Sequence, residues 1–207
     1  ESIQVPLRVV NIVYPLIHVP PKHDLQEDLL LMTTITYSLL TAEEAAKGQD
    51  ELYNVLSACV ALGASIGFVS NEPAPMKQFW TGVIASLASG EKRLLVARRQ
   101  QEIVGTVIVE FCGKPNGSHR AEIAKLLVHP DARRQGIARE LLGRAERLAE
   151  QEGKTLLVLD TRSGDAAEQL YLAQGWQVCG QIPYFALSTR GEPEATTVMY
   201  KQVTAGV

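Results

Sequence analysis

The sequence predicts an α/β domain of the mixed (α+β) type, and three observations support that class. Stretches with apolar residues at helical spacing alternate with short apolar or alternating stretches typical of strands. Residues 154–160 are almost continuously apolar, which favours a strand that lies parallel to its neighbour and is covered on both faces. The chain has 207 residues, of which 46% are hydrophobic, and this suffices for one domain with a sizeable core.

Residues 1–31 differ from the rest of the chain. They are rich in proline, and their apolar run at residues 9–19 is interrupted and too short to span a bilayer. The stretch has neither the basic start nor the small-residue cleavage site of a signal peptide. Met32 resembles a natural start of translation. We therefore expect a flexible N-terminal extension over residues 1–31 and a single domain over residues 32–207.

The first half of the domain is expected to begin with a strand at residues 34–40, where apolar and polar residues alternate. Thr41 then caps a helix, and Glu44, three places further on, completes a capping box. Apolar residues at helical spacing continue this helix to Gly63. After a loop, a second helix is expected at residues 75–89.

Hairpins and a second group of helices and strands follow. Strands are expected at residues 94–99 and 103–112. A Lys-Pro-Asn-Gly turn at residues 114–117, whose asparagine and glycine accept positive φ, leads into a strand at residues 121–128. The remaining elements are a helix, the apolar strand, another helix and two strands, at residues 137–152, 154–160, 166–174, 175–181 and 196–203.

Composition and motifs exclude several function classes. A net charge of −3 argues against general nucleic-acid binding, which needs a basic face. The three cysteines form no CxxC pair and are expected to be reduced, cytosolic and packed, and the histidines have no metal-ligand spacing with them. Residues 63–67 match GxSxG, the nucleophile elbow of hydrolases. That elbow requires a preceding strand, whereas a helix is expected here, so a hydrolase is disfavoured.

One basic bend carries most of the functional argument. It follows the apolar run at residues 126–128 and opens the helix at residues 137–152. A helix N-terminus presents free backbone N–H groups and positive potential, and a glycine lets a ligand approach the backbone closely. The bend is therefore suited to a phosphate group, although an ordinary basic surface turn has the same sequence. Its residues are Arg133, Arg134, Gln135, Gly136, Ile137 and Ala138.

Two sequence blocks resemble the GNAT superfamily of N-acetyltransferases. In the acyl-CoA signature of that family an Arg or Gln is followed at +3 by Gly and at +5 by Gly or Ala, which matches Arg133, Gly136 and Ala138. The block at residues 169–176 resembles the family's tyrosine-bearing helix and the strand after it. The resemblance implies a GNAT fold. We expect a mixed, mostly antiparallel sheet of six to seven strands with about four helices on both faces and a splay between two central parallel strands.

The resemblance also implies a co-substrate, acetyl-CoA, and no metal. Its pyrophosphate would lie on the bend from Arg133 to Arg139, mainly on backbone N–H groups. Its pantetheine arm would pair like an added strand with the chain around Leu126, Leu127 and Val128. A backbone N–H there, that of Leu127, would polarise the thioester carbonyl.

Three side chains are the candidate catalytic groups. Tyr171 matches the tyrosine that the family uses as general acid toward the CoA sulfur, and the alternative is a core tyrosine. Glu122 and Asp160 interrupt otherwise apolar strands. Each is a candidate to take the proton of the acceptor amine or to hold the ammonium. The alternatives are surface acids, or for Asp160 the start of the next helix.

A narrower resemblance concerns the tabtoxin-resistance acetyltransferase branch. It rests on residues 64–68, 114–117, 120–122 and 159–161, together with Lys125, Leu126 and Gly164. In that branch the residues matching Glu122, Asp160 and Tyr171 lie in the active site, and the substrate is a β-lactam amino-acid toxin. Gly164 departs from the wider family, where this place often holds an asparagine that touches pantetheine.

The sequence therefore predicts an acetyl-CoA-dependent N-acetyltransferase that acts on a small amine, such as an amino-acid-like toxin or antibiotic, by direct transfer. Two alternatives stay open. One is acetylation of a protein or peptide amine, and the other is a non-catalytic acyl-CoA-binding module. The partner is a small molecule, with neither nucleic acid nor membrane involved. We expect a cytoplasmic location, and a homodimer is one option.

Overall fold

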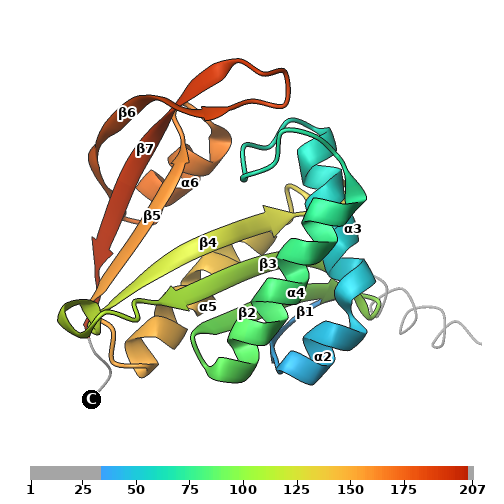
Figure 1. Ribbon diagram of the computed structural model, residues 1–207. Coiled ribbons are helices and arrows are strands. Elements are labelled where there is room, and N and C mark those ends of the chain that lie inside the picture. Colours follow the sequence, from blue (N-terminus) through green and yellow to red (C-terminus); the bar gives the residue numbers. More distant parts are fainter. Residues whose placement is uncertain (1–33, 205–207) are drawn as a thin grey trace, which may run out of the picture. The chain divides into compact units, whose positions relative to one another are not determined.

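The computed structural model describes residues 34–204, so the predicted extension at residues 1–31 lies outside the described residues. The described part contains one seven-stranded sheet in the order β1-β2-β3-β4-β5-β7-β6 (Figure 1). Each pair of neighbouring strands in this sheet is antiparallel except β4 and β5, which are parallel. The predicted mixed, mostly antiparallel fold class is therefore confirmed.

The strands and helices have the following bounds. The strands are β1 (Ile35–Leu40), β2 (Lys92–Arg99), β3 (Glu102–Phe111), β4 (Arg120–Val128), β5 (Leu156–Arg162), β6 (Gln177–Leu187) and β7 (Pro193–Gln202). The α-helices are α2 (Ala42–Lys47), α3 (Gln49–Ala61), α4 (Pro73–Ser89), α5 (Ile137–Gln151) and α6 (Ala166–Ala173). Two 3₁₀ turns, η1 (Pro115–Gly117) and η2 (Pro130–Ala132), flank β4.

Two hydrophobic clusters fill the two faces of the sheet. On one face, α5 and α6 pack against side chains such as Ile123 and Leu157. On the other face, α2, α3 and α4 pack against β2, β3 and β4, and the fully buried Trp80 and Leu52 belong to this cluster. Figure 1 shows α5 and α6 behind the sheet and the other three helices in front of it. The front helices cover β1 to β4 and leave the front of β5, β7 and β6 without a helix.

The first helix is interrupted, contrary to the prediction of one helix from Thr41 to Gly63. The capping box is confirmed, because the Thr41 side chain accepts from the Glu44 N–H at 3.2 Å and the Glu44 carboxylate accepts from the Thr41 N–H at 2.8 Å. However, Gly48 ends α2 and starts α3. Glycine is a poor helix former, and a Cβ at this position would lie 3.4 Å from Ile103 of β3, so the chain bends where it crosses that strand.

The predicted conformation of the turn at residues 114–117 is wrong. Asn116 and Gly117 do not take positive φ, and the turn is the 3₁₀ turn η1. A neighbouring side chain explains why a glycine is present here, because a Cβ on Gly117 would come 2.5 Å from the Sγ of Cys112. The glycine is therefore needed for close packing rather than for its φ angle.

The prediction that the strand at residues 154–160 is covered on both faces is also wrong. Leu157 and Leu159 are buried under α5 and α6, whereas Leu156 and Val158 are only partly buried and Asp160 is exposed. Strand β5 lies beyond the reach of α3 and α4, so its front face is left for a ligand. Among the described residues no helix is both long and apolar enough to cross a membrane.

Candidate active site

The candidate site is built around a splay between the two parallel strands. Strands β4 and β5 pair only at their beginnings, through Arg120 with Leu156, Ala121 with Leu157 and Glu122 with Val158. Beyond Glu122, β4 continues beside β3 and β5 continues beside β7. The β5-facing backbone of residues 123–128 therefore has no strand neighbour, and an extended ligand can pair with it.

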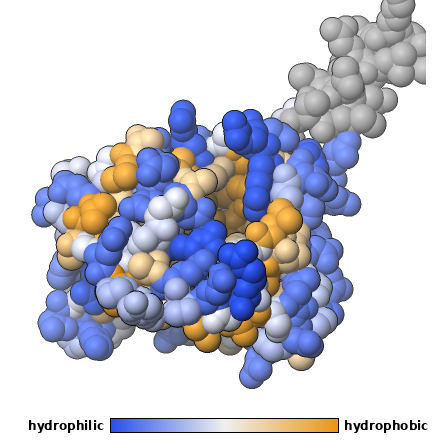
Figure 2. All heavy atoms as spheres, turned by 90° about the horizontal axis from the view of Figure 1, so that it is seen from above, coloured by the Kyte–Doolittle hydropathy of each residue, from blue (hydrophilic) through white to orange (hydrophobic). Residues whose placement is uncertain are grey.

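The loop that follows α3 and the hairpin between β6 and β7 lie at the top of the splay as two arms (Figure 1). The side chain of Arg162, at the end of β5, donates a hydrogen bond of 3.1 Å to the carbonyl of Gly63, just after α3. The loop after α3 thus reaches across to the β5 side (Figure 1). Seen from above, the molecule is hollowed between these two arms, with hydrophobic residues inside the hollow and hydrophilic residues around it (Figure 2).

A bulge in β4 shapes the wall of the splay. Ile108 pairs with Ala124 and Thr106 pairs with Leu127, so two residues of β4, Lys125 and Leu126, face a single residue of β3. Lys125 has φ 50°, which a side chain rarely adopts. The hydroxyl of the buried Thr106 donates to the Lys125 carbonyl at 2.9 Å and holds the bulge in place. The bulge reverses the inward and outward alternation of the strand at the splay.

The basic bend lies between β4 and α5, and its residues 133–136 are exposed. Arg134 and Gly136 both have positive φ, 65° and 77°, and Gly136 is the N-cap of α5 without any side-chain cap. A Cβ added at Gly136 would meet no atom within 4 Å, so the space in front of the first turn of α5 is open. The N–H groups of that turn have no intrahelical partner and can bind a phosphate group.

The residues predicted for the cofactor follow one another along the end of β4 and into the bend. Leu126, Leu127 and Val128 lie on the unpaired part of β4, and the bend follows after the short turn η2. The Nε of Arg133 donates to the carbonyl of Val128 at 3.3 Å, which joins the bend to the strand. Arg134, Gln135, Gly136 and Arg139 are exposed, whereas Ile137 is buried in the core and Ala138 is half-buried. The side chain of Ile137 therefore anchors the helix, and only its backbone is available to a ligand.

Tyr171 is buried on α6, packed at a ring distance of 5.8 Å from Trp176. Within residues 34–204 its hydroxyl makes no hydrogen bond and no ion pair. Burial, and then the negative charge of Asp160, raise the pKa of Tyr171 to about 12. The phenol therefore keeps its proton throughout the neutral range and is free to donate it to a ligand.

The two predicted carboxylates lie on neighbouring strands of the uncovered front face. Asp160 on β5 accepts a hydrogen bond of 3.0 Å from the hydroxyl of Thr196 on β7. It does not start the next helix, which Asp165 caps instead. Partial burial, and then the charges of Glu110 and Asp160, raise the pKa of Glu122. The structure thus brings Glu122, Asp160 and Tyr171 into one electrostatic neighbourhood.

An open pocket of about 500 Å³ begins where the two strands still pair. Glu122 and Val158 line it, together with Glu110, Phe111 and Cys112 from the end of β3. The carboxylate of Glu110 is neutralised by Lys92 at 2.5 Å. Of the two acids that interrupt the strands, Glu122 therefore faces a space that can hold a small molecule.

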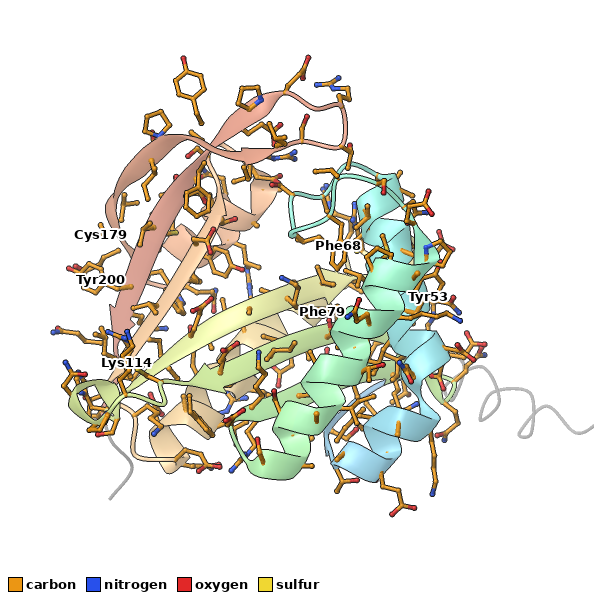
Figure 3. All side chains as sticks on the ribbon, viewed as in Figure 1. Tyr53, Phe68, Phe79, Lys114, Cys179 and Tyr200 are labelled. Carbon is orange, nitrogen blue, oxygen red and sulfur yellow. The ribbon has the colours of Figure 1, made fainter. Side chains whose placement is uncertain are left out.

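Several residues of this region were missed by sequence reasoning. Phe79 of α4 points toward β4 and makes edge contacts with Phe68 and Trp80 at 6.0 and 5.2 Å, so an aromatic wall faces the splay (Figure 3). Lys125 lies with its ammonium 5.2 Å from the Phe79 ring centroid. The signal that singled out Glu122 and Asp160, a charged residue inside an apolar strand, applies equally to Lys125 and could have identified it.

Metal binding has no candidate in the part of the chain that the structure describes. No group of three or more His, Cys, Asp or Glu side chains there could hold a metal ion. The cysteines Cys59, Cys112 and Cys179 are all free thiols.

The fold and the splay place the chain in a known class. The sequence model of the Acetyltransferase (GNAT) family matches residues 42–176, well over half of the chain. The chain belongs to this family.

Solved structures with the same fold include enzymes with different acceptors. A ribosomal-protein-alanine N-acetyltransferase from Brucella melitensis is 20% identical, with a TM-score of 0.67 over 81% of this chain and 99% of that one. A protein from Salmonella typhimurium, described as an acetyltransferase and solved with its cofactor acetyl-CoA, is 19% identical, with a TM-score of 0.68 over 84% and 97%. A phosphinothricin acetyltransferase from Sinorhizobium meliloti, in complex with acetyl-CoA, is 16% identical, with a TM-score of 0.69 over 84% and 91%. At these identities the likeness shows the shared fold alone.

Proposed function

We propose that this protein is an acetyl-CoA-dependent N-acetyltransferase that moves an acetyl group directly to the amine of a small molecule. The observation that carries the proposal is the splay, because it leaves the β5-facing edge of residues 123–128 without a strand partner and leads to an exposed helix N-terminus. Two proteins of the same fold were solved with acetyl-CoA. The activity belongs to the domain over residues 32–207, with residues 1–31 as an extension.

The chain binds acetyl-CoA mainly through backbone groups. The bend from Arg133 to Arg139 receives the pyrophosphate on the first N–H groups of α5, and the open space at Gly136 fits such a group. Leu126, Leu127 and Val128 pair with the pantetheine arm along the unpaired edge of β4. Leu127 pairs with Thr106 and its N–H points toward β3, so the donor to the thioester carbonyl is the N–H of Leu126 or Val128 rather than the predicted N–H of Leu127. One such donor contributes about 3 kcal/mol in other acyl-transfer enzymes.

Glu122 and Asp160 prepare the acceptor. An amine with a pKa near 10 arrives as an ammonium and must lose a proton before it can attack. The raised pKa of Glu122 makes this carboxylate a better proton acceptor than an ordinary glutamate. Asp160, held by Thr196, keeps the ammonium in place beside it. The neutral nitrogen then forms the new C–N bond at the thioester carbon.

Tyr171 assists the departing sulfur as the C–S bond breaks. A free thiol has a pKa near 8.5, whereas the pKa of Tyr171 is about 12. Full proton transfer to a finished thiolate would thus be uphill by roughly 3.5 pK units, or about 5 kcal/mol. Tyr171 therefore acts by a hydrogen bond that strengthens as negative charge develops on sulfur. The nitrogen gives up a proton as it becomes an amide, and a proton ends on the CoA thiol, so the transfer from the neutral amine conserves charge.

The acceptor class rests on the top of the splay. The bond from Arg162 to Gly63 ties the loop after α3 to the β5 side, which favours an enclosed small molecule over a long peptide. The likeness to the tabtoxin-resistance branch suggests an amino-acid-like toxin or antibiotic. The phosphinothricin acetyltransferase fold is in keeping with that choice. Acetylation of a protein amine is the second candidate, because a ribosomal-protein-alanine N-acetyltransferase has the same fold. We infer a cytoplasmic enzyme, and a homodimer is a further expectation for light scattering to test.

The test is Tyr171→Phe, with Tyr37→Phe as a matched control, since Tyr37 is a partly buried tyrosine on β1, away from the splay. We expect Tyr171→Phe to lower turnover about 100-fold while acetyl-CoA binding is preserved. The assay is CoA release with a panel of amines that includes β-lactam amino acids, aminoglycosides and a peptide with an alanine N-terminus. Unchanged function in Tyr171→Phe would favour the non-catalytic acyl-CoA-binding module, and a preference for the peptide would favour the protein acceptor.

A further inference from the structure

Lys125 occupies an unusual place in the wall of the splay. It lies in the β4 bulge with positive φ, a conformation that costs free energy for a residue with a side chain. Phe79 lies 5.2 Å from its ammonium, and Phe79 also lines the groove along α4 that includes Lys92. The side chain therefore projects to the front of the sheet beside α4, which is the side of the sheet on which the carboxylates of the candidate site also lie (Figure 1).

The ammonium of Lys125 lacks a partner within the described residues. No acceptor forms a hydrogen bond or an ion pair with it there, whereas Lys92 in the same region is paired with Glu110. Glu122 and Asp160 influence it electrostatically but lie outside ion-pair distance. Burial lowers the pKa of Lys125, and the charges of Asp160 and Glu122 partly oppose this. A half-buried ammonium without a hydrogen-bond acceptor is poorly solvated, and this favours binding of an anionic ligand group.

Charged side chains of both signs thus remain available to a ligand around the splay. Glu122 and Asp160 offer negative charge to an ammonium, and Lys125 offers positive charge to an anion. A diamine would satisfy the acids but would be repelled by Lys125. A zwitterion with one amine and one carboxylate satisfies both ends, so the arrangement selects by attraction and by repulsion together.

We propose that Lys125 binds the carboxylate of the acceptor, and hence that the acceptor is an amino acid or a close analogue with a free carboxylate. This inference rests on the proposed function and names the group that selects its substrate. Lys125 is a specificity residue. It takes no part in proton transfer, and its loss should act on KM far more than on kcat.

The experiment compares matched pairs of acceptors that differ only by the carboxylate. The pairs are L-phenylalanine with phenethylamine, L-lysine with cadaverine, and L-histidine with histamine. The variants are Lys125→Met, Lys125→Arg and, as a control, Lys77→Met. Lys77 also lies over an aromatic ring, that of Tyr53 at 5.4 Å, but it is exposed on α4.

We expect the wild type to prefer the amino acid in the pairs that it accepts. Lys125→Met should raise KM for that amino acid about 30-fold, because a desolvated charge pair is lost, and should leave or lower KM for the amine. Lys125→Arg should restore part of the preference, and Lys77→Met should behave as the wild type does. A preference for the amines, or an equal change in both members of each pair, would overturn the role of Lys125.

Calorimetry separates failure of this inference from failure of the proposed function. If acetyl-CoA binds but no amine in any panel releases CoA, the proposed function fails. The role of Lys125 is then decided by titrating each amino acid into the CoA-loaded protein. Binding to the wild type that is lost in Lys125→Met supports it. Equal binding to both proteins, or binding to neither, overturns it.

Discussion

The two ends of the site are made of different parts of the chain. At the cofactor end, the bend at Arg134 and Gly136 is exposed, and its binding groups are backbone N–H groups of α5. At the acceptor end, side chains from separate strands, among them Glu122, Asp160 and Lys125, supply the charges. Backbone donors survive every substitution except one to proline, whereas side chains can be removed one at a time. The two ends should therefore respond to mutation in opposite ways.

They should also respond to different solution conditions. Arginine charges at the exposed bend are screened by salt, because water surrounds them. At the acceptor end the side chain of Lys125 is partly buried, and the pKa values of Glu122 and Lys125 are shifted. Ionic strength is thus the natural probe of the cofactor end, and pH is the natural probe of the acceptor end.

The largest effect is expected from blocking the backbone site with Gly136→Asp. The new carboxylate would project into the open space where the pyrophosphate binds, and like charges placed together cost several kcal/mol. We expect acetyl-CoA affinity to fall about 100-fold or more, with the loss measured by calorimetry. Normal acetyl-CoA binding by this variant would show that the cofactor does not lie on the bend.

Gly153→Asp is the matched control for that variant. Gly153 also has positive φ, 72°, and a Cβ there would also meet no atom within 4 Å, but it follows the opposite end of α5. Both substitutions impose similar backbone strain of roughly 1 kcal/mol. Only Gly136→Asp should weaken acetyl-CoA binding, so strain and charge are separated.

The next largest effect is expected at the acceptor end with Glu122→Gln. Loss of a general base commonly costs about 100-fold in rate, and we expect about 30-fold here because Asp160 or a water molecule can replace part of the function. In the wild type, kcat/KM should fall as the pH drops through the raised pKa of Glu122, above the usual value near 4.3. A pH profile of Glu122→Gln that keeps the wild-type acid limb would exclude Glu122 as the base.

The same substitution should raise stability, which a purely structural carboxylate would not do. Because its pKa is raised in the folded protein, Glu122 binds its proton more tightly there than in the unfolded chain. The wild type thus loses stability as the pH rises from the unfolded pKa through the folded one. Above that window Glu122→Gln should unfold at a higher temperature than the wild type, by less than about 1 kcal/mol because the side chain is partly solvated. Below the window the two proteins should have equal stability.

A smaller effect is expected when Asp160 loses its support. Thr196→Val removes the hydroxyl that donates to Asp160 at 3.0 Å, and we expect turnover to fall about fivefold, corresponding to about 1 kcal/mol for one hydrogen bond. Asp160→Asn should cost more and should also move the acid limb of the pH profile downward, because the charge of Asp160 helps to raise the pKa of Glu122. An unmoved acid limb in Asp160→Asn would mean that the two carboxylates do not share a site.

The contrast between the cofactor end and the acceptor end also explains which parts of the site could be predicted from the sequence. The cofactor end is local in sequence, since Arg133, Gly136 and Ala138 lie on one bend, and a strand, bend and helix can be recognised from a short pattern. The order of the strands also follows once the family is recognised. The acceptor end is assembled from β3, β4, β5 and β7, so its neighbours depend on sheet topology and on where β4 and β5 part.

The local geometry at the acceptor end could not be predicted from sequence patterns for a second reason. Strand alternation predicts which side each residue faces only while the pleat is regular. The bulge at Lys125 reverses the alternation, so the lysine could not be assigned to a face. The conformation of the turn at residues 114–117 was also mispredicted, because Gly117 serves close packing against Cys112 rather than a positive φ angle.

The smallest effect is expected from Arg134→Ala, although this arginine lies within the basic bend. The side chain is exposed and the backbone supplies most of the binding, so we expect acetyl-CoA affinity to fall only about threefold at moderate salt. The difference from the wild type should shrink further as ionic strength rises, because screening weakens an exposed charge pair. Calorimetric titrations at low and high salt measure this directly. A loss as large as that of Gly136→Asp, or one that salt does not change, would mean that the cofactor end depends on its side chains and that the contrast between the two ends is wrong.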